Sequence, residues 1–278
     1  MTYLVAAWSI AGVSWLDDLR SVSNRVRFTT HAAGALLILL AVGFWPQVEL
    51  PFVSSMPLGW LGLPLTFFWL AGLTNAYNFM DGIDGLAGTQ AVVAGLGWLV
   101  LGGIVGLPIV SLLGVLLAGS SLGFLGHNWP PARIFMGDVG SAFLGFSLAV
   151  LAVIGGLAHP RLPLAGLLVV WPFVFDTTFT IVRRLRRGEN IFAAHRSHLY
   201  QRLVIAGYSH GAVTLLYAGL ALIGVVLALA WVLKLPASDW LALGLPGLLS
   251  LGLWQLVVRA ETRSLPLQRP TPTVGDSA

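Results

Sequence analysis

The 278-residue sequence contains no cysteine and very few charged side chains. Charged residues make up 9% of the chain, whereas they make up roughly 25% of an average soluble protein. The absence of cysteine excludes disulfide bridges and thiolate chemistry. The shortage of charge excludes a disordered chain, a protein that binds nucleic acid and an ordinary cytosolic enzyme.

Hydrophobic residues make up 57% of the sequence and are gathered in long runs. Because a helix needs about 20 apolar residues to cross a lipid bilayer, these runs predict an all-α polytopic membrane protein with about nine transmembrane helices. We expect one transmembrane domain over residues 1–258 and a disordered polar tail over 259–278. The predicted spans cover residues 1–16, 28–45, 59–78, 86–105, 109–126, 141–158, 162–182, 210–233 and 239–258.

The basic residues are distributed unequally between the two sides of the predicted bundle. Arg161 and Lys234 lie on one side, and the other 13 of the 15 Lys and Arg residues lie on the opposite side. Because basic loops remain in the cytoplasm, the second side is predicted to be cytoplasmic. Its loops cover residues 17–27, 79–85, 127–140 and 183–209, together with the tail.

Acidic residues gather on the same predicted side, next to apolar helices where an unpaired charge is costly. Asp17 and Asp18 end the first span, and because adjacent carboxylates repel, they require a cation nearby or one raised pKa. Either could accept a proton from a substrate phosphate, or orient Arg25 or Arg27. Asp176 is the one acidic residue well inside a predicted span.

The segment 75–88 carries Asn75, Asn78, Asp81 and Asp84 at intervals of three residues. Members of each pair would share a face of a continuous helix. The glycines at positions 82, 85 and 88 favour a break in that helix and a close approach of the backbone to a ligand. Carboxylate and amide oxygens are the ligands that Mg²⁺ prefers, with substrate phosphates completing the shell.

Two further loops on this side carry polar groups. Asp138 and Ser141 lie where the sixth span begins, so Asp138 could cap that helix, or the helix terminus could hold a phosphate. In the loop 183–209, His195, Arg196 and His198 suit a pyrophosphate, and the two histidines would share one face of a helix. A zinc site is disfavoured because no cysteine or third matching ligand is close.

These segments occur in an order that resembles the polyprenyl-phosphate N-acetylhexosamine-1-phosphate transferase family. The resemblance rests on Asp17-Asp18, the run 75–87, Phe135-Met-Gly-Asp138-Val-Gly-Ser141 and His195-Arg-Ser-His198. The run 195–202 looks most like the branch that initiates O-antigen or exopolysaccharide synthesis. Its single histidines, in place of a histidine triplet, argue against the peptidoglycan member.

The resemblance implies Mg²⁺-dependent transfer of a sugar-1-phosphate from a UDP-N-acetylhexosamine to undecaprenyl phosphate. Mn²⁺ is an expected substitute, and a homodimer is left open. The site would face the cytoplasm from the inner membrane of a bacterium. The implied catalytic residues are Asp17, Asp18 and Asp138, and the implied metal ligands are Asn78 and Asp138. The implied substrate-binding residues are Arg27, Asn75, Asp81, Asp84, His195, Arg196 and His198.

The predicted helix count also departs from the resemblance, because the family has more spans and a Gly/Arg-rich loop between its first two. We therefore expect further helices to be encoded upstream, over about 50 to 70 residues. A transporter with a proton relay is the main alternative, and it predicts carboxylates near the middle of spans. A CDP-alcohol phosphotransferase and a membrane scaffold explain the Asn/Asp/Gly run less well.

Overall fold

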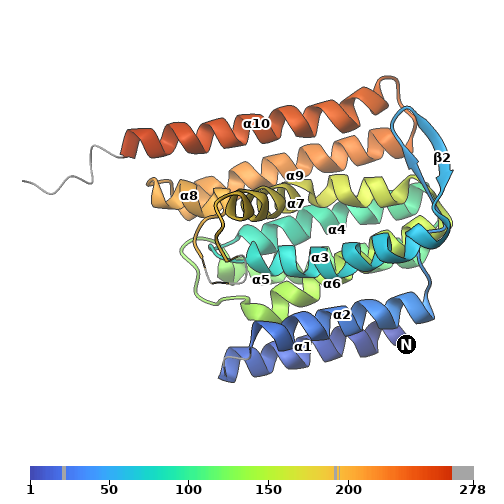
Figure 1. Ribbon diagram of the computed structural model, residues 1–278, viewed down its shortest axis with the longest axis horizontal. Coiled ribbons are helices and arrows are strands. Elements are labelled where there is room, and N and C mark those ends of the chain that lie inside the picture. Colours follow the sequence, from blue (N-terminus) through green and yellow to red (C-terminus); the bar gives the residue numbers. More distant parts are fainter. Residues whose placement is uncertain (21–22, 191–192, 194, 265–278) are drawn as a thin grey trace, which may run out of the picture.

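A computed structural model describes residues 1–20, 23–190, 193 and 195–264. In that part of the chain, nine long helices lie side by side and run alternately up and down (Figure 1). The all-α polytopic architecture predicted from the sequence is confirmed. The long helices are α1 (Thr2–Arg20), α2 (Asn24–Ala41), α3 (Gly62–Phe79), α4 (Leu86–Ile104), α5 (Pro108–Asn128), α6 (Gly137–Ala158), α7 (Leu162–Arg186), α9 (His210–Val232) and α10 (Ser238–Ser264).

Six of these helices are long and apolar enough to cross a membrane, counted over the described residues: α4, α5, α6, α7, α9 and α10. The other three are of similar length but have polar residues at one end, such as Asp17 and Asp18 in α1, Arg25 and Arg27 in α2, and Asn78 in α3. They still belong to the bundle, because α1 packs against α2 and α6, and α3 packs against α2 and α6.

One end of the bundle collects the polar loops, and we call it the basic end. The turns α1–α2, α3–α4 and α5–α6 and the segment between α7 and α9 meet there, at the left of Figure 1. The N-terminus of the chain lies at the opposite end. Every basic residue predicted for one side lies at the basic end, apart from Arg269, which is outside the described residues. The predicted alternation of loops therefore agrees with the fold.

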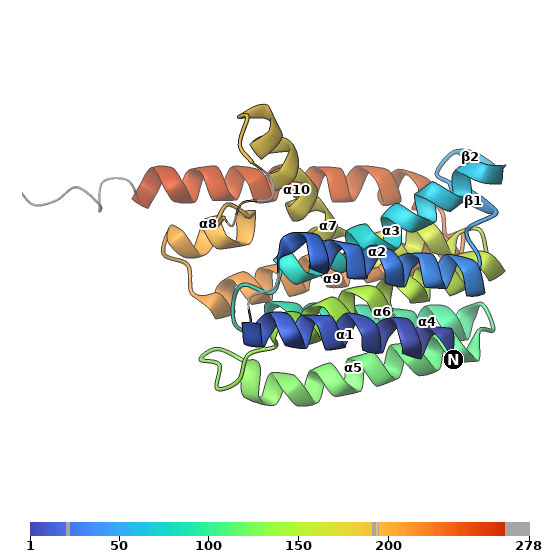
Figure 2. The same ribbon diagram turned by 60° about the horizontal axis from the view of Figure 1, so that its bottom comes forward.

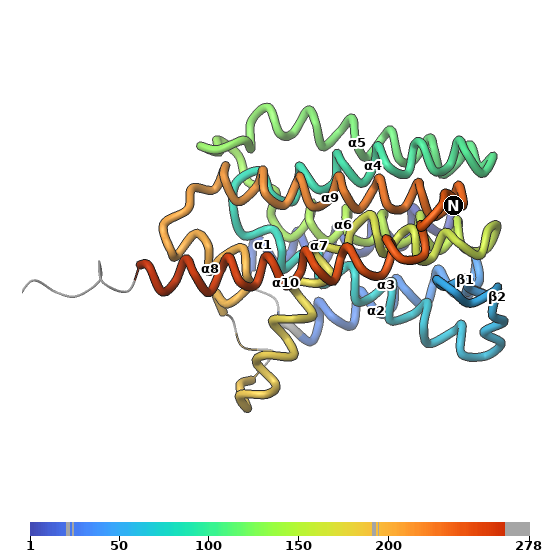
Figure 3. Tube along the Cα trace, turned by 90° about the horizontal axis from the view of Figure 1, so that it is seen from above, coloured from blue at the N-terminus to red at the C-terminus, as the bar shows by residue number. Residues whose placement is uncertain are grey.

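Helix α6 forms the centre of the bundle, and α10 lies at its edge. Of the apolar stretch of α6, 78% is buried inside the protein, against 22% for α10. Helix α7 bends, and its C-terminal part turns away from the bundle in Figures 2 and 3. Pro172 lies inside α7, and because proline lacks the N–H that a helix requires, it accounts for the bend.

Several elements differ from the sequence-based expectation. A hairpin of β1 (Gln47–Leu50) and β2 (Val53–Pro57), followed by the short η1 (Gly59–Leu61), joins α2 to α3. A seven-residue helix, α8 (Leu199–Ile205), lies in the loop before α9. Neither was predicted, because short elements leave little periodicity in a sequence.

Helix α10 also continues further than expected. It ends at Ser264, so the first residues of the expected disordered tail are helical. Glu261 accounts for this extension, because its carboxylate accepts two hydrogen bonds of 2.7 Å from the guanidinium of Arg202 in α8. Residues 265–278, the remainder of the expected tail, lie outside the described part of the chain.

Candidate active site

Four aspartates converge at the basic end, and we call them the carboxylate cluster: Asp17, Asp18, Asp81 and Asp138. Asp17 and Asp18 come from the last turn of α1, Asp81 from the α3–α4 turn and Asp138 from the first turn of α6. The contacts of α6 with α1 and α3 bring these segments together, although they are up to 121 residues apart in the sequence. All four were predicted as site residues.

Asp138 lies at the centre of the polar contacts. Its Oδ1 accepts a hydrogen bond of 2.9 Å from Nδ2 of Asn78, and its Oδ2 pairs with the guanidinium of Arg27. The same Arg27 nitrogen donates to Oδ2 of Asp17 at 2.8 Å. Asp18 contributes differently, because its Oδ1 accepts the backbone N–H of Asp138 at 3.2 Å. Asp18 therefore caps the start of α6, and Asp17 holds Arg27.

The predicted metal ligands, Asn78 and Asp138, do lie together. Both hydrogens of the Asn78 amide are used, since Nδ2 also donates to Oγ of Ser141 at 2.9 Å. The Oδ1 of Asn78 accepts none of the hydrogen bonds found in the described residues. Within the same part of the chain, no three His, Cys, Asp or Glu side chains are arranged to hold a metal ion by themselves. This donor set matches Mg²⁺, which is usually held by one or two carboxylates together with substrate phosphates.

Asp81 is buried near two other carboxylates of the cluster. Burial, together with repulsion from Asp138 and Asp18, raises its pKa from the ordinary value of 3.8 to about 7. The carboxylates of Asp138 and Asp18 thus disfavour a further negative charge on Asp81. A cation bound there would relieve this repulsion.

This raised pKa makes the stability of the protein depend on pH. In the unfolded chain Asp81 ionises near pH 4, whereas in the folded chain it keeps its proton up to about pH 7. Between these values the folded state binds more protons, so stability falls as pH rises. We expect Asp81→Asn to unfold at a higher temperature than the wild type at pH 8 without divalent cations, by a margin that shrinks towards pH 5. Thermal unfolding in detergent measures this, with Asp239→Asn at the opposite end as the control. A margin that does not change with pH would contradict the assignment.

The α3–α4 turn includes only the second of the two pairs expected on shared helix faces. Asn75 and Asn78 both lie on α3, where the amide of Asn75 donates to the carbonyl of Ala71 at 2.8 Å. The helix ends after Phe79, as the glycines predicted. Asp81 and Asp84 therefore lie in the turn, outside the helix.

Asp84 fixes two neighbouring segments. Its Oδ2 accepts the N–H of Ala132 at 3.1 Å and lies 3.3 Å from Nδ1 of His210. Its carbonyl accepts the hydroxyl of Thr214 at 2.9 Å. These contacts connect the α5–α6 loop to the start of α9, and the predicted substrate-binding role of Asp84 stays a prediction.

The glycines of this turn approach protein atoms rather than open space. A Cβ at Gly82 would lie 2.1 Å from the hydroxyl of Tyr200, and one at Gly88 would lie 2.9 Å from Leu125. Gly85 has a φ of +78° and precedes the first residue of α4, where other residues are strained. These contacts give the glycines a packing role, and the expected approach of the backbone to a ligand stays a prediction.

Gly82→Ala should disturb the contact between α8 and α3. The hydroxyl of Tyr200 donates to the carbonyl of Phe79 at 2.9 Å, and the new methyl group would displace it. We expect an overpacking loss of about 1–3 kcal/mol in unfolding free energy. Gly72→Ala is the control, because a Cβ there meets nothing within 4 Å. Equal unfolding curves for the two variants would contradict the expectation.

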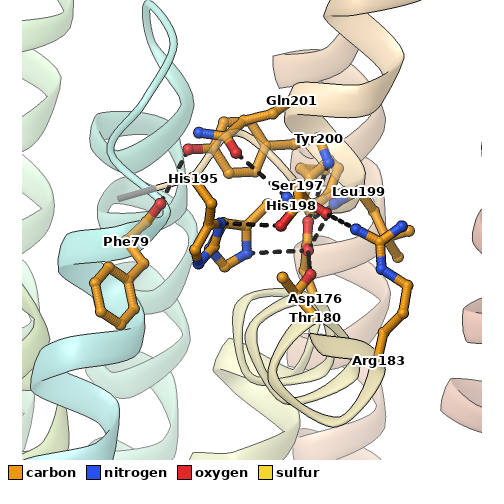
Figure 4. A network of polar contacts seen from close by, with 11 residues as sticks. Phe79, Asp176, Thr180, Arg183, His195, Ser197, His198, Leu199, Tyr200 and Gln201 are labelled. Atoms are coloured by element: carbon orange, nitrogen blue, oxygen red, sulfur yellow. Dashed lines mark hydrogen bonds and ion pairs between the residues drawn. The ribbon is translucent and has the colours of Figure 1, made fainter. Parts of the chain in front are cut away.

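The predicted histidine motif lies beside this contact but not on one helix face. His195 precedes α8, and His198 is its N-cap, so the expected shared face is wrong. The two rings nevertheless lie near each other, with 5.1 Å between their centroids (Figure 4). Burial, and the nearby His198 and Arg184, lower the pKa of His195 to about 4, so it is neutral at pH 7. Arg196 is exposed.

Asp176 is a polar residue of this region that the sequence did not predict for the site. It is 0% exposed and binds the start of α8. The position of Asp176 inside an apolar span could have indicated a polar network around it, because a buried carboxylate is retained only where partners satisfy it.

The fold and these contacts define a polytopic membrane protein with a polar, anion-rich site at one end of its helices. A family model for glycosyl transferase family 4 matches residues 1–156, which include the whole carboxylate cluster. The chain belongs to this family, the polyprenyl-phosphate N-acetylhexosamine-1-phosphate transferases.

The names of individual relatives agree with this family. A probable undecaprenyl-phosphate N-acetylglucosaminyl 1-phosphate transferase of Bacillus subtilis (strain 168) is 35% identical over 244 residues, which cover 86% of this chain and 67% of that protein. A phospho-N-acetylmuramoyl-pentapeptide-transferase of Synechococcus sp. (strain JA-3-3Ab) is 34% identical over 82% of this chain and 69% of its own. A decaprenyl-phosphate N-acetylglucosaminephosphotransferase of Mycobacterium leprae (strain TN) is 30% identical over 77% of this chain and 60% of its own. The chain thus spans about two thirds of the length of these relatives.

Proposed function

We propose that this protein transfers an N-acetylhexosamine 1-phosphate from a UDP-sugar to undecaprenyl phosphate, releasing UMP. The observation that carries the proposal is the convergence of Asp17, Asp18, Asp138, Asn78 and Arg27 at one end of a membrane bundle. The relatives named for transfer to undecaprenyl and decaprenyl phosphate support the same reaction type. The product would initiate a cell-envelope polysaccharide such as an O-antigen.

In this reaction an oxygen of the lipid phosphate forms a bond to the sugar-bearing phosphorus of the donor. The bond from that phosphorus to the bridging oxygen breaks, and the bridging oxygen leaves with UMP. Both substrates are anions, so the site must offset their charge and align the attack. Arg27 supplies a guanidinium for this, and Asp17 fixes where that guanidinium lies.

The proposed metal is Mg²⁺, with Mn²⁺ as a substitute. Asp138 and Asn78 would hold it through oxygen atoms, and Asp81 and Asp18 would add negative charge around it. When bound, such an ion neutralises the phosphates and orients them. A readout independent of turnover is the unfolding temperature, which Mg²⁺ should raise in the wild type but not in Asp138→Asn.

The proposed orientation places the basic end in the cytoplasm of a bacterium, at the inner membrane. The distribution of arginines at that end supports it. The lipid acceptor would approach from the bilayer. An apolar groove of about 800 Å³ between α7 and α10, lined by Phe175, Phe179, Leu248 and Trp254 among others, offers a lipid chain a surface along the bent helix.

The transporter alternative finds little support. Asp176 is the buried carboxylate that a proton relay would use, but both of its oxygens accept hydrogen bonds from backbone N–H groups of α8. The remaining acids that face the basic end lie at helix termini or in loops.

Purified protein incubated with undecaprenyl phosphate and a panel of radiolabelled UDP-sugars tests the proposal. We expect lipid-linked label and UMP in equal amounts, with Mg²⁺ required, and the panel identifies the sugar. Folded protein that forms neither product from UDP-GlcNAc, UDP-GalNAc or 6-deoxy N-acetylhexosamine donors would overturn it.

A further inference from the structure

A fully buried carboxylate in α7 organises the loop that follows this helix. Asp176 is 0% exposed, and its Oδ1 accepts the backbone N–H of Leu199 at 2.8 Å while its Oδ2 accepts that of Tyr200 at 3.1 Å. The hydroxyl of Tyr217 in α9 donates to Oδ2 at 2.6 Å, and that of Thr180 lies 3.3 Å from Oδ1. Figure 4 shows α8 starting directly above this carboxylate. Asp176 thereby fixes where α8 begins.

The same carboxylate contacts His198, whose Nδ1 lies 3.3 Å from Oδ1 of Asp176 (Figure 4). An ionised carboxylate only accepts hydrogen bonds, so Nδ1 is the nitrogen that carries a proton. The other ring nitrogen, Nε2, is left for a different partner.

That second nitrogen is buried without a partner. His198 is 2% exposed, and its Nε2 has no hydrogen-bond partner among the described residues. A buried polar atom in this state is costly unless something binds it. The ring lies 5.1 Å from that of His195 and 6.1 Å from that of Phe79, measured between centroids. Phe79 directly follows Asn78, so the free nitrogen lies beside the end of α3 that carries the cluster contact.

A histidine in this position suits a phosphate because an imidazole ring can carry a positive charge. Among the described side chains that hydrogen-bond to Asp176, His198 is the one with this capacity. In the charged ring, Nδ1–H faces Asp176 and Nε2–H is a donor suited to an anionic oxygen.

We propose that Asp176 is a positioning residue that holds His198 through Nδ1, so that Nε2–H donates to a phosphate group of the bound donor nucleotide. This role rests on the proposed function, because the phosphate belongs to the UDP-sugar. Asp176 itself does not touch substrate. The proposal is based on the buried contact between Asp176 and His198 and on the unpartnered Nε2 of His198.

The kinetic test uses Asp176→Asn, His198→Gln and the double variant. We expect Asp176→Asn to lower kcat/KM for the UDP-sugar roughly 10- to 100-fold, the scale seen for residues that orient a functional histidine. The double variant should lose no more than His198→Gln alone, because Asp176 acts through that ring. Tyr217→Phe is the matched control, since it removes a bond to Asp176 but not the one to His198, and it should keep near wild-type turnover. Losses that add in the double variant would overturn the proposal.

A spectroscopic test does not depend on turnover and so separates the two proposals. ¹⁵N-histidine-labelled protein in lipid nanodiscs reports which ring nitrogens are protonated, and His198→Gln assigns one of the six histidine signals. We expect a protonated Nδ1 at His198 in the wild type and in Tyr217→Phe, a proton on Nε2 as well when UDP is bound, and a changed signal in Asp176→Asn. A UDP-bound ring without a proton on Nε2 would overturn the contact to phosphate. A wild-type His198 without a proton on Nδ1 would overturn the positioning role even if no variant folds. A protonated Nδ1 in protein that transfers no sugar would instead reject the proposed function.

Discussion

Asp138→Asn should reduce sugar-phosphate transfer by about 10²- to 10³-fold, the usual cost of removing one group that stabilises charge in the transition state. Asp138 is the residue on which Asn78, Arg27 and the backbone contact to Asp18 converge. Asparagine keeps the shape and the cap at the start of α6, but it loses the charge that pairs with Arg27. The variant should therefore keep the fold but lose the charged carboxylate that Asn78 and Arg27 contact.

The measurement is the transfer rate at limiting and saturating Mg²⁺, together with the unfolding temperature of each protein. Asp239→Asn is the control, because Asp239 binds the backbone of Phe52 at the opposite end. We expect the control to match the wild type. A near wild-type rate for Asp138→Asn at limiting Mg²⁺ would remove Asp138 from the proposed metal site.

Asp17→Asn and Asp18→Asn should have unequal effects, although the two residues are adjacent. The side chain of Asp17 is 10% exposed and holds Arg27, whereas Asp18 is exposed and caps α6. Loss of the Asp17 charge frees Arg27 to move, and a misplaced phosphate-binding group costs about 10²-fold in rate. We expect this deficit for Asp17→Asn to be the same from pH 6 to pH 9, as a positioning role requires.

The effect of Asp18→Asn should be smaller and should shrink as pH rises. Asp18 is the exposed member of the pair, so its carboxylate can accept the last proton of the lipid phosphate. That phosphate has a second pKa near 6, so a base helps less at high pH. Rate profiles of both variants over this pH range separate the roles. A pH-dependent deficit in Asp17→Asn and a flat one in Asp18→Asn would reverse them.

The amino-acid sequence was enough to predict the helices and the end of the bundle where the polar residues gather. Apolar runs separated by turns fix where helices form, because every backbone polar group in a bilayer must be satisfied within its own segment. Asp17 and Asp138 were identifiable because charged residues next to such runs are costly, whereas His198 was identified from the polar motif that it forms with His195 and Arg196. The break after Phe79 followed from glycines that disfavour a continuous helix.

The contacts among these residues could not be predicted in this way, because contacts between distant segments depend on how the helices pack. The tertiary structure assigned Arg27, and not Arg25, to Asp17 and Asp138, since α1 and α6 lie against each other. Partial burial together with nearby His198 and Arg184 lowers the pKa of His195, and the fold places the carboxylate of Asp176 under α8. Burial and partner choice set the charge of each group, and neither is encoded in local spacing.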